Sequence, residues 1–144
     1  MSPKNTVLYA DDDTDDLQFI KEAFEHYADT VDLVTVSDGL EAVAYLDNMP
    51  QHHQAPCLII LDINMPRMDG KEALKTIRDM KRFKEVPAIL FTTSSQHKDK
   101  EFAKSYNAGF LTKPIDYKQL DRIAGQLINH CTDEIKKKLL NEIN

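Results

Sequence analysis

Acidic side chains are concentrated near the amino terminus of the chain. Asp11, Asp12, Asp13, Asp15 and Asp16 fall within six positions. Crowded carboxylates raise one another's pKa unless a cation offsets their charge. Their oxygens suit Mg²⁺, which binds one or two protein carboxylates and keeps its remaining waters. The same cluster is also compatible with a solvated turn followed by the acidic first turn of a helix.

A calcium-binding loop is a second interpretation of this cluster. Asp11, Asp13, Asp15 and Glu22 match positions 1, 3, 5 and 12 of an EF-hand loop. Position 6, where the loop turns sharply and needs glycine, is Asp16. The acids also follow a strand-like run instead of a helix. Both departures disfavour the calcium loop.

Three further residues could act together with these acids. Asp62 directly follows a run of apolar residues, Thr92 follows another, and Lys113 precedes a proline. A carboxylate can attack phosphorus and form an aspartyl phosphate. A lysine and a threonine hydroxyl could then bind oxygens of the transferred group. Taken alone, each residue has an ordinary structural interpretation: a turn cap, a strand-end cap or a surface lysine.

Apolar runs that alternate with helical patterns predict the elements that position these residues. Five runs predict strands: Thr6–Ala10, Val31–Val36, Cys57–Leu61, Val86–Phe91 and Gly109–Thr112. Apolar residues spaced three or four apart predict helices around 17–27, 40–46, 73–80, 96–107 and 120–131. Such alternation is typical of an α/β fold, a parallel sheet with helices on both faces. Ligands of these sheets bind beyond the carboxyl ends of the strands, where the candidate residues lie.

Length, charge and composition exclude several classes of protein. A chain of 144 residues predicts one domain. Its 18 basic and 24 acidic residues give a net charge of −6, so we expect no nucleic-acid partner. Cys57 and Cys131 lie far apart in the sequence, which favours reduced thiols in a cytoplasmic protein. The sequence shows neither a signal-peptide pattern nor an apolar run of membrane-spanning length, so we expect no membrane partner.

Four motifs together resemble the receiver domain of two-component response regulators. They are YADDD (Tyr9–Asp13), LDINMPRMDG (Leu61–Gly70), FTTSS (Phe91–Ser95) and GFLTKP (Gly109–Pro114). The resemblance covers about residues 5–130. It implies a flavodoxin-like, doubly wound, five-stranded parallel sheet in the order 2-1-3-4-5, with five helices and a C-terminal extension.

The resemblance also implies a role for each candidate residue. Asp62 would be the phosphoryl acceptor, and Thr92 and Lys113 would contact the phosphoryl group. Phe110 would be the aromatic switch residue that responds to Thr92. The Lys113–Pro114 peptide bond would be cis. Mg²⁺ or Mn²⁺ would be held by Asp11, Asp12, Asp62 and the backbone carbonyl of Asn64.

We therefore expect a stand-alone, single-domain response regulator. It would accept a phosphoryl group from a histidine kinase or histidine phosphotransfer protein and signal through altered protein–protein contacts. It would not be an enzyme in the sense of turnover. One alternative is a Mg²⁺-dependent aspartyl-phosphate phosphatase, although Asn64 stands where such enzymes usually carry a second acid. The other is a pseudo-receiver that binds partners without carrying phosphate.

Two segments exceed a minimal receiver. We expect residues 1–130 to form the receiver and 131–144 to form a helical extension. The apolar stripe of Ile135, Leu139, Leu140 and Ile143 would either pack on its own domain or contact a kinase or a second copy in a homodimer. The loop Asn48–Pro56 is long, as in stand-alone receivers that serve phytochrome-type kinases, and its two histidines are interpreted as solvated.

Overall fold

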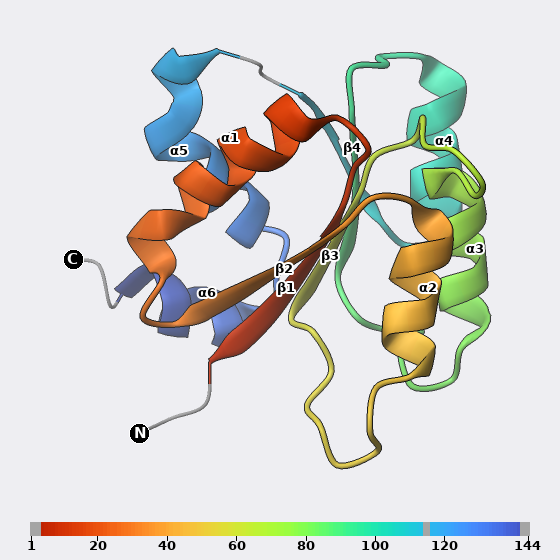
Figure 1. Ribbon diagram of the computed structural model, residues 1–144, viewed down its shortest axis with the longest axis horizontal. Helices are drawn as coiled ribbons and strands as arrows, with labels where there is room; N and C mark the ends of the chain where they lie inside the picture. The colour runs from red at the N-terminus through yellow and green to blue at the C-terminus, as the bar shows by residue number, and fades with distance from the viewer. Residues whose placement is uncertain (1–3, 114–115, 142–144) are drawn as a thin grey trace.

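The fold is a five-stranded parallel sheet covered by helices on both faces (Figure 1). The computed structural model describes residues 4–113 and 116–141. The strands are β1 (Asn5–Ala10), β2 (Val31–Val36), β3 (Leu58–Leu61), β4 (Ala88–Thr92) and β5 (Gly109–Thr112). Their order is β2-β1-β3-β4-β5, which confirms the predicted fold class and topology.

Helices cover the two faces of the sheet in two groups (Figure 1). One face carries α1 (Thr14–Phe24), α5 (Leu120–Ile128) and α6 (Asp133–Asn141). The other carries α2 (Gly39–Asp47), α3 (Gly70–Asp79) and α4 (His97–Ser105). Two short 3-10 helices, Glu25–Tyr27 and Tyr117–Gln119, complete the described elements. No helix in the described part of the chain is long and apolar enough to cross a membrane.

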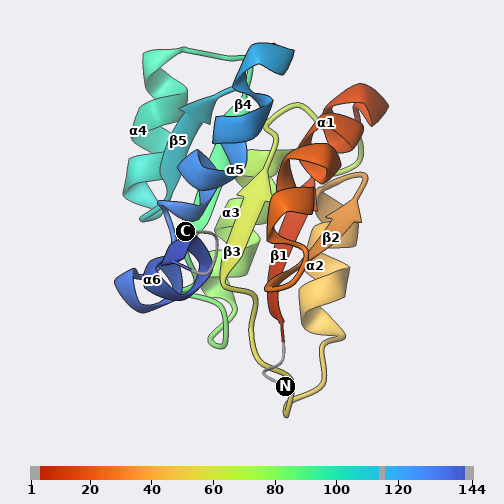
Figure 2. The ribbon, with the colours of Figure 1, turned by 90° about the vertical axis from the view of Figure 1, so that its left-hand side faces the viewer.

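The strands read as continuous apolar runs because both of their faces are buried. Along β1, Val7 and Tyr9 pack toward α1 and α5, whereas Leu8 packs toward α2 and α3. Every residue of β3 and β4 is buried. Figure 2 shows that the carboxyl ends of the strands gather at one edge of the sheet. The loops at that edge carry the candidate residues.

Two strands begin later than their apolar runs predicted. The strand predicted from Cys57 begins at Leu58, and the one predicted from Val86 begins at Ala88. Pro87 has no backbone N–H to offer a neighbouring strand, so regular pairing starts after it. At its other end β4 continues one residue further than predicted, to Thr92, which pairs with Thr112.

The C-terminal helix α6 packs on its own domain. Leu139 is fully buried in the cluster formed by β1, α1 and α5, and Ile135 and Leu140 pack against the same cluster. This contact favours the interpretation of the apolar stripe as an intramolecular one.

The long loop between α2 and β3 is held in place by an arginine from the α3–β4 connection. The Arg82 guanidinium donates to the carbonyl of Met49 at 2.9 Å and also to the carbonyl of His53. His52 and His53 are exposed, as expected, and their rings are stacked edge to face. The loop is therefore fixed near its start and at its middle.

A second arginine joins α3 to two neighbouring segments. Arg78 donates to the carbonyls of Phe83 at 3.2 Å and Val86 at 2.8 Å, which precede β4. It also donates to Tyr106 at 2.8 Å and Asn107 at 3.1 Å, at the end of α4. Burial lowers the pKa of its guanidinium. The four carbonyls accept the hydrogen bonds that water would otherwise accept from it. Arg78 thus connects α3, the start of β4 and the end of α4.

Replacing Arg78 should destabilise the fold strongly. Hydrogen bonds to charged groups contribute about 1.5–3 kcal/mol each and are not additive, so we expect Arg78→Ala to lower the free energy of unfolding by about 2–4 kcal/mol. Urea denaturation followed by circular dichroism measures this change. Lys75→Ala, an exposed position on the same helix, is the control and should change stability by less than about 0.5 kcal/mol. Equal effects of the two substitutions would contradict the role of Arg78.

Candidate functional site

The parallel pairing of β1 and β3 brings the predicted metal-binding carboxylates together. Asp11 and Asp62 directly follow the two strands, whose last residues Ala10 and Leu61 are in register. The Asp62 N–H donates to the carbonyl of Ala10 at 3.0 Å. One carboxylate oxygen each from Asp11, Asp12 and Asp62 lies within 4.8 Å of the other two. The predicted cluster of three acids is therefore present as a compact group.

The three carboxylates differ in exposure and in their hydrogen bonds. Asp11 is fully buried and accepts from the Tyr9 hydroxyl at 2.5 Å and from the Asp13 N–H at 3.0 Å. Asp62 is 6% exposed, and its Oδ1 accepts from the Ile63 N–H at 2.9 Å. Asp12 is exposed to solvent. The group is thus closed by protein on one side and open on the side of Asp12.

The Lys113 ammonium lies among these carboxylates. Its Nζ is 2.6 Å from Asp11 Oδ2, 2.7 Å from Asp16 Oδ2 and 3.3 Å from Asp62 Oδ2, and its side chain is 4% exposed. The Lys113 N–H donates to the Thr92 carbonyl at 2.8 Å, so the end of β4 fixes its backbone. The site therefore contains its own buried cation. The predicted cis bond between Lys113 and Pro114 lies outside the described residues.

Burial and charge together set the protonation of the site. Burial raises the pKa of Asp62 to about 6; the Lys113 ammonium opposes this shift, and Asp11 adds to it. Burial alone would lower the pKa of Lys113, but its hydrogen bonds to Asp11 and Asp16 raise it above the usual value. Burial and the Asp11 carboxylate raise the pKa of Tyr9, which keeps its hydroxyl a neutral donor.

Asp16 is a site residue that the sequence did not reveal. Its position among the clustered acids predicted the first turn of a helix and not a contact with Lys113. Asp16 lies on α1 on the same face as Phe19, Ile20 and Ala23, all of which are buried. That spacing could have shown that its carboxylate faces inward. Asp13 accepts from the N–H groups of Asp15 and Asp16 and caps the helix. This strand–turn–helix geometry contradicts the calcium-loop interpretation.

The other two predicted residues lie on the neighbouring strands. Thr92 ends β4 and is fully buried, and its Oγ1 accepts from the Ser94 N–H at 3.3 Å. Phe110 is half-buried on β5 opposite Leu90, and the Lys100 ammonium lies 5.9 Å from the centre of its ring. Thr92 is thus at the carboxyl end of β4, and Phe110 lies on the neighbouring strand and packs in the same cluster as Ala103 of α4.

A polar cavity of about 300 Å³ lies between the loop after Asp62 and the loop after Thr92. Asn64, two residues after Asp62, is exposed and lines it. On its far side the Lys71 ammonium forms an ion pair with Asp99, whose other oxygen accepts from the Ser94 hydroxyl at 2.6 Å. The hydrogen bonds from Lys71 and Ser94 lower the pKa of Asp99. The sequence analysis missed this ion pair because only the apolar residues of the fourth helix were assigned to its inner face.

One glycine allows the loop after β3 to fold tightly against α3. A Cβ atom at Gly70 would lie 2.0 Å from the carbonyl oxygen of Asp62, which no side chain can tolerate. The Gly70 N–H donates to the carbonyl of Ile63 at 2.9 Å, and Asp69 caps α3. This packing fixes the backbone of Asp62 and Ile63, from which the Asp62 carboxylate projects.

The donors of the three-acid group fit a hard divalent cation. All are carboxylate oxygens, two of them buried and one exposed, which suits Mg²⁺ or Mn²⁺ with retained waters better than a metal that prefers imidazole or thiolate. The Asp62 carboxylate can also act as a nucleophile. The Lys113 ammonium beside it, together with a bound metal, would balance the charge of a negatively charged electrophile.

Replacing Asp62 should stabilise the protein in the presence of a chelator. The pKa of Asp62 is raised from 3.8 to about 6 in the folded state, so the ionised carboxylate lowers the stability of the fold. This loss of stability is absent below pH 4, where the carboxyl group is protonated in both states, and is complete above pH 6. At about 1.4 kcal/mol per pKa unit, Asp62→Asn should add about 1–3 kcal/mol at pH 7.5, and less at pH 5. Urea denaturation at both values measures this; Asp15→Asn, an exposed acid of the same cluster, is the control. A loss of stability in Asp62→Asn at pH 7.5 would contradict this account.

Comparisons with known proteins agree with this geometry. A family model described as response regulator receiver domain matches residues 7–124. Response regulator Rcp1 of Synechocystis sp. is 30% identical over 124 residues, which cover 83% of each chain. The phosphorylated cyanobacterial phytochrome response regulator RcpA has a similar structure, with a TM-score of 0.78 and 27% identity over 97% of this chain and 96% of that one.

A third comparison concerns a structure that contains a metal. The Mn²⁺-bound form of response regulator Rcp1 has a TM-score of 0.73 and 29% identity, covering 84% of this chain and 88% of that chain. The match of the family model, the relatives and the arrangement of the acids all lead to the same assignment. The chain belongs to the family of response regulator receiver domains.

Proposed function

We propose that Asp62 accepts a phosphoryl group from a phosphohistidine of a histidine kinase or a histidine phosphotransfer protein. The observation that carries this proposal is the position of the Asp62 carboxylate. It is buried, lies 3.3 Å from the Lys113 ammonium and forms a compact group with Asp11 and Asp12. The site thus combines a nucleophile, a fixed cation and donors for a divalent metal.

The two oxygens of Asp62 have different surroundings. Oδ1 accepts from the Ile63 N–H, whereas Oδ2 faces Lys113. We assign the attack to Oδ2, because Oδ1 is held by the backbone. A bond forms from this oxygen to phosphorus while the bond from phosphorus to the imidazole nitrogen breaks, and the imidazole leaves with the electron pair. Lys113 then neutralises a phosphoryl oxygen.

Thr92 is placed to bind a second phosphoryl oxygen. Its Oγ1 accepts from the Ser94 N–H, so the hydroxyl hydrogen remains available for donation. Asp11, Asp12 and Asp62, with the backbone carbonyl of Asn64, would hold Mg²⁺ or Mn²⁺. The metal would supply positive charge opposite Lys113 during transfer. The Mn²⁺-bound form of Rcp1 supports this assignment.

The protein acts in this proposal as a phosphoryl acceptor and not as a turnover enzyme. Asn64 occupies the position at which an aspartyl-phosphate phosphatase would need its second acid, and an amide cannot transfer protons in that role. The response would be a change in protein–protein contacts. Similarity to the phytochrome response regulator RcpA and the long loop before β3 support a phytochrome-type kinase as phosphodonor. Phosphotransfer from such kinases, compared with other histidine kinases, tests that choice.

Asp62 should be the single phosphorylated residue. Incubation with acetyl phosphate and Mg²⁺ should add one phosphoryl group per chain, removable by hydroxylamine and detected by intact-mass spectrometry. Asp62→Asn should abolish it, since the amide is not a nucleophile, whereas Asp69→Asn, in the loop after β3, should retain it. Persistent label on Asp62→Asn would refute the assignment.

A divalent metal should be required for this reaction and should depend on Asp12. We expect Asp12→Asn to reduce Mg²⁺ affinity by at least about tenfold, as measured by calorimetry, because it removes one carboxylate from the group. Phosphorylation should fall with it and should also stop in chelator. Asp15→Asn removes the same charge outside the group and should leave both unchanged. Full phosphorylation in chelator would show that the acids serve another purpose.

The last expectation concerns how Thr92 transmits the change. A phosphoryl group at Asp62 would attract the Thr92 hydroxyl, and the half-buried Phe110 could fill the space behind it. Thr92→Ala should therefore still accept phosphate but lose most of the difference in partner affinity between the two forms. Partner binding with and without beryllofluoride measures this, with exposed Thr93→Ala as control. The same affinity ratio in Thr92→Ala and wild type would exclude this coupling.

A further inference from the structure

Two thiols meet at the edge of the sheet opposite Asp62. Cys57 immediately precedes β3, and Cys131 follows α5 at its junction with α6. They are 74 residues apart and are the two cysteines of the sequence. In the structure Cys131 belongs to a hydrophobic cluster against which Cys57 packs, and the interaction of the two thiols shifts both of their pKa values. The two side chains are therefore neighbours.

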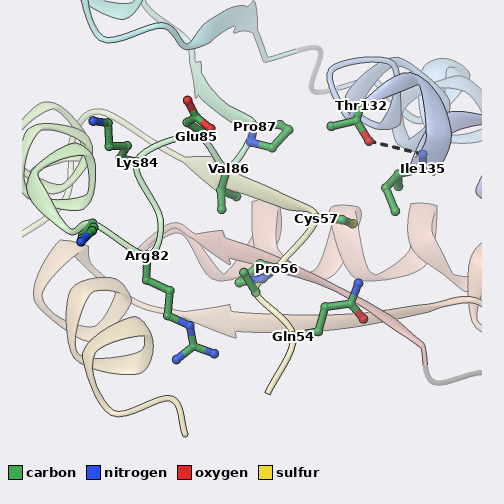
Figure 3. Close-up of a pocket in the computed structure, with 12 residues that line it drawn as sticks. Gln54, Pro56, Cys57, Arg82, Lys84, Glu85, Val86, Pro87, Thr132 and Ile135 are labelled. Atoms are coloured by element: carbon green, nitrogen blue, oxygen red, sulfur yellow. Dashed lines mark hydrogen bonds between the residues drawn. The ribbon is translucent and has the colours of Figure 1, made fainter. Parts of the chain in front are cut away.

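The two thiols differ in access to solvent. Cys131 is 6% exposed, whereas Cys57 is half-buried and lines an open cavity of about 610 Å³. Figure 3 shows the Cys57 side chain in the wall of this cavity, directed toward Ile135 of α6. A small solute can thus reach Cys57 more readily than Cys131, which is buried and borders a smaller cavity of about 270 Å³.

Basic side chains outnumber acidic ones around the cavity, and the interaction with Cys131 favours the thiolate of Cys57. Lys81, Arg82 and Lys84 line the cavity with one carboxylate, Glu85. The hydrogen bond from Cys131 lowers the pKa of Cys57, although burial opposes the change. The same bond, together with burial, raises the pKa of Cys131. Cys57 is therefore the nucleophile of the pair, since the thiolate is the reactive form.

We propose that Cys57 and Cys131 form a peroxide-sensitive thiol pair that closes to an intramolecular disulfide. The Cys57 thiolate attacks one oxygen of a hydroperoxide, the O–O bond breaks, and Cys57 becomes a sulfenic acid while the other oxygen leaves as hydroxide or alkoxide. Cys131 then attacks the Cys57 sulfur, the S–O bond breaks, and its oxygen leaves as water with the thiol proton. Two thiols are oxidised and one peroxide is reduced.

The bond would connect two segments that pack together in one hydrophobic cluster. It would fix the start of β3 to the junction of α5 and α6, next to the buried face of α6. The site is independent of phosphoryl transfer, because it lies at the amino ends of the strands. Asp62→Asn should therefore oxidise in the same way as the wild type.

Mass spectrometry of the folded full chain tests the proposal. After hydrogen peroxide treatment, quenching with catalase and denaturation in iodoacetamide, we expect both thiols to be lost to alkylation and restored by a reductant. Peptide mapping should join the Cys57 and Cys131 peptides within a monomer. Two alkylated thiols, a disulfide between chains, or Cys57 sulfinate as the main product would each overturn the proposal.

Single-thiol variants test the order of the two steps. Cys131→Ala should stop at the sulfenic acid of Cys57, which dimedone captures, and Cys57→Ala should leave Cys131 unreacted because it is buried. Reaction of Cys131 in folded Cys57→Ala at the wild-type rate would contradict the assignment of Cys57 as the nucleophile. If either variant fails to fold by circular dichroism, the cross-linked peptide of the wild type still decides the proposal.

Discussion

The Lys113 ammonium supplies the positive charge on which the carboxyl edge of the sheet depends. Asp11, Asp16 and Asp62 bring three carboxylates into a region from which water is largely excluded, and each contacts this one cation. Removing the Lys113 ammonium would leave these buried carboxylates without their cation, which is strongly destabilising. The Thr92 carbonyl holds the Lys113 backbone, so the pairing of β4 and β5 also fixes the charge balance of the site.

The same ammonium limits how a metal can enter. Asp11 Oδ2 already accepts from Lys113 and from the Tyr9 hydroxyl, so a cation at Asp11 has Oδ1 as its more available oxygen. Oδ1 in turn accepts from the Asp13 N–H. The exposed Asp12 carries no such constraint. A metal would therefore approach from the side of Asp12, while the Lys113 ammonium offsets part of the negative charge on the buried side.

The sequence was sufficient for features that depend on local pattern. Apolar runs predicted all five strands, and the period of the apolar residues predicted the helices between them. The strand order that makes the acids at the ends of β1 and β3 neighbours came instead from the resemblance to receiver domains. The sequence was insufficient where a contact joins side chains distant along the chain. Nothing near Asp16 indicates Lys113, and nothing near Asp99 indicates Lys71. These pairs depend on how α1 and α4 are rotated against the sheet.

Helix α4 is held differently at its two ends. At its carboxyl end, Arg78 binds the carbonyls of Tyr106 and Asn107. At its amino end, the Asp99 carboxylate forms an ion pair with Lys71 and accepts from the hydroxyl of Ser94. Between them, Ala103 is its one fully buried apolar residue. Such a helix can tilt about its carboxyl end, which Arg78 holds, while its amino end moves. A shift of the loop after Thr92, which carries Ser94, would then move the amino end of α4 and the solvent-facing side chains near it.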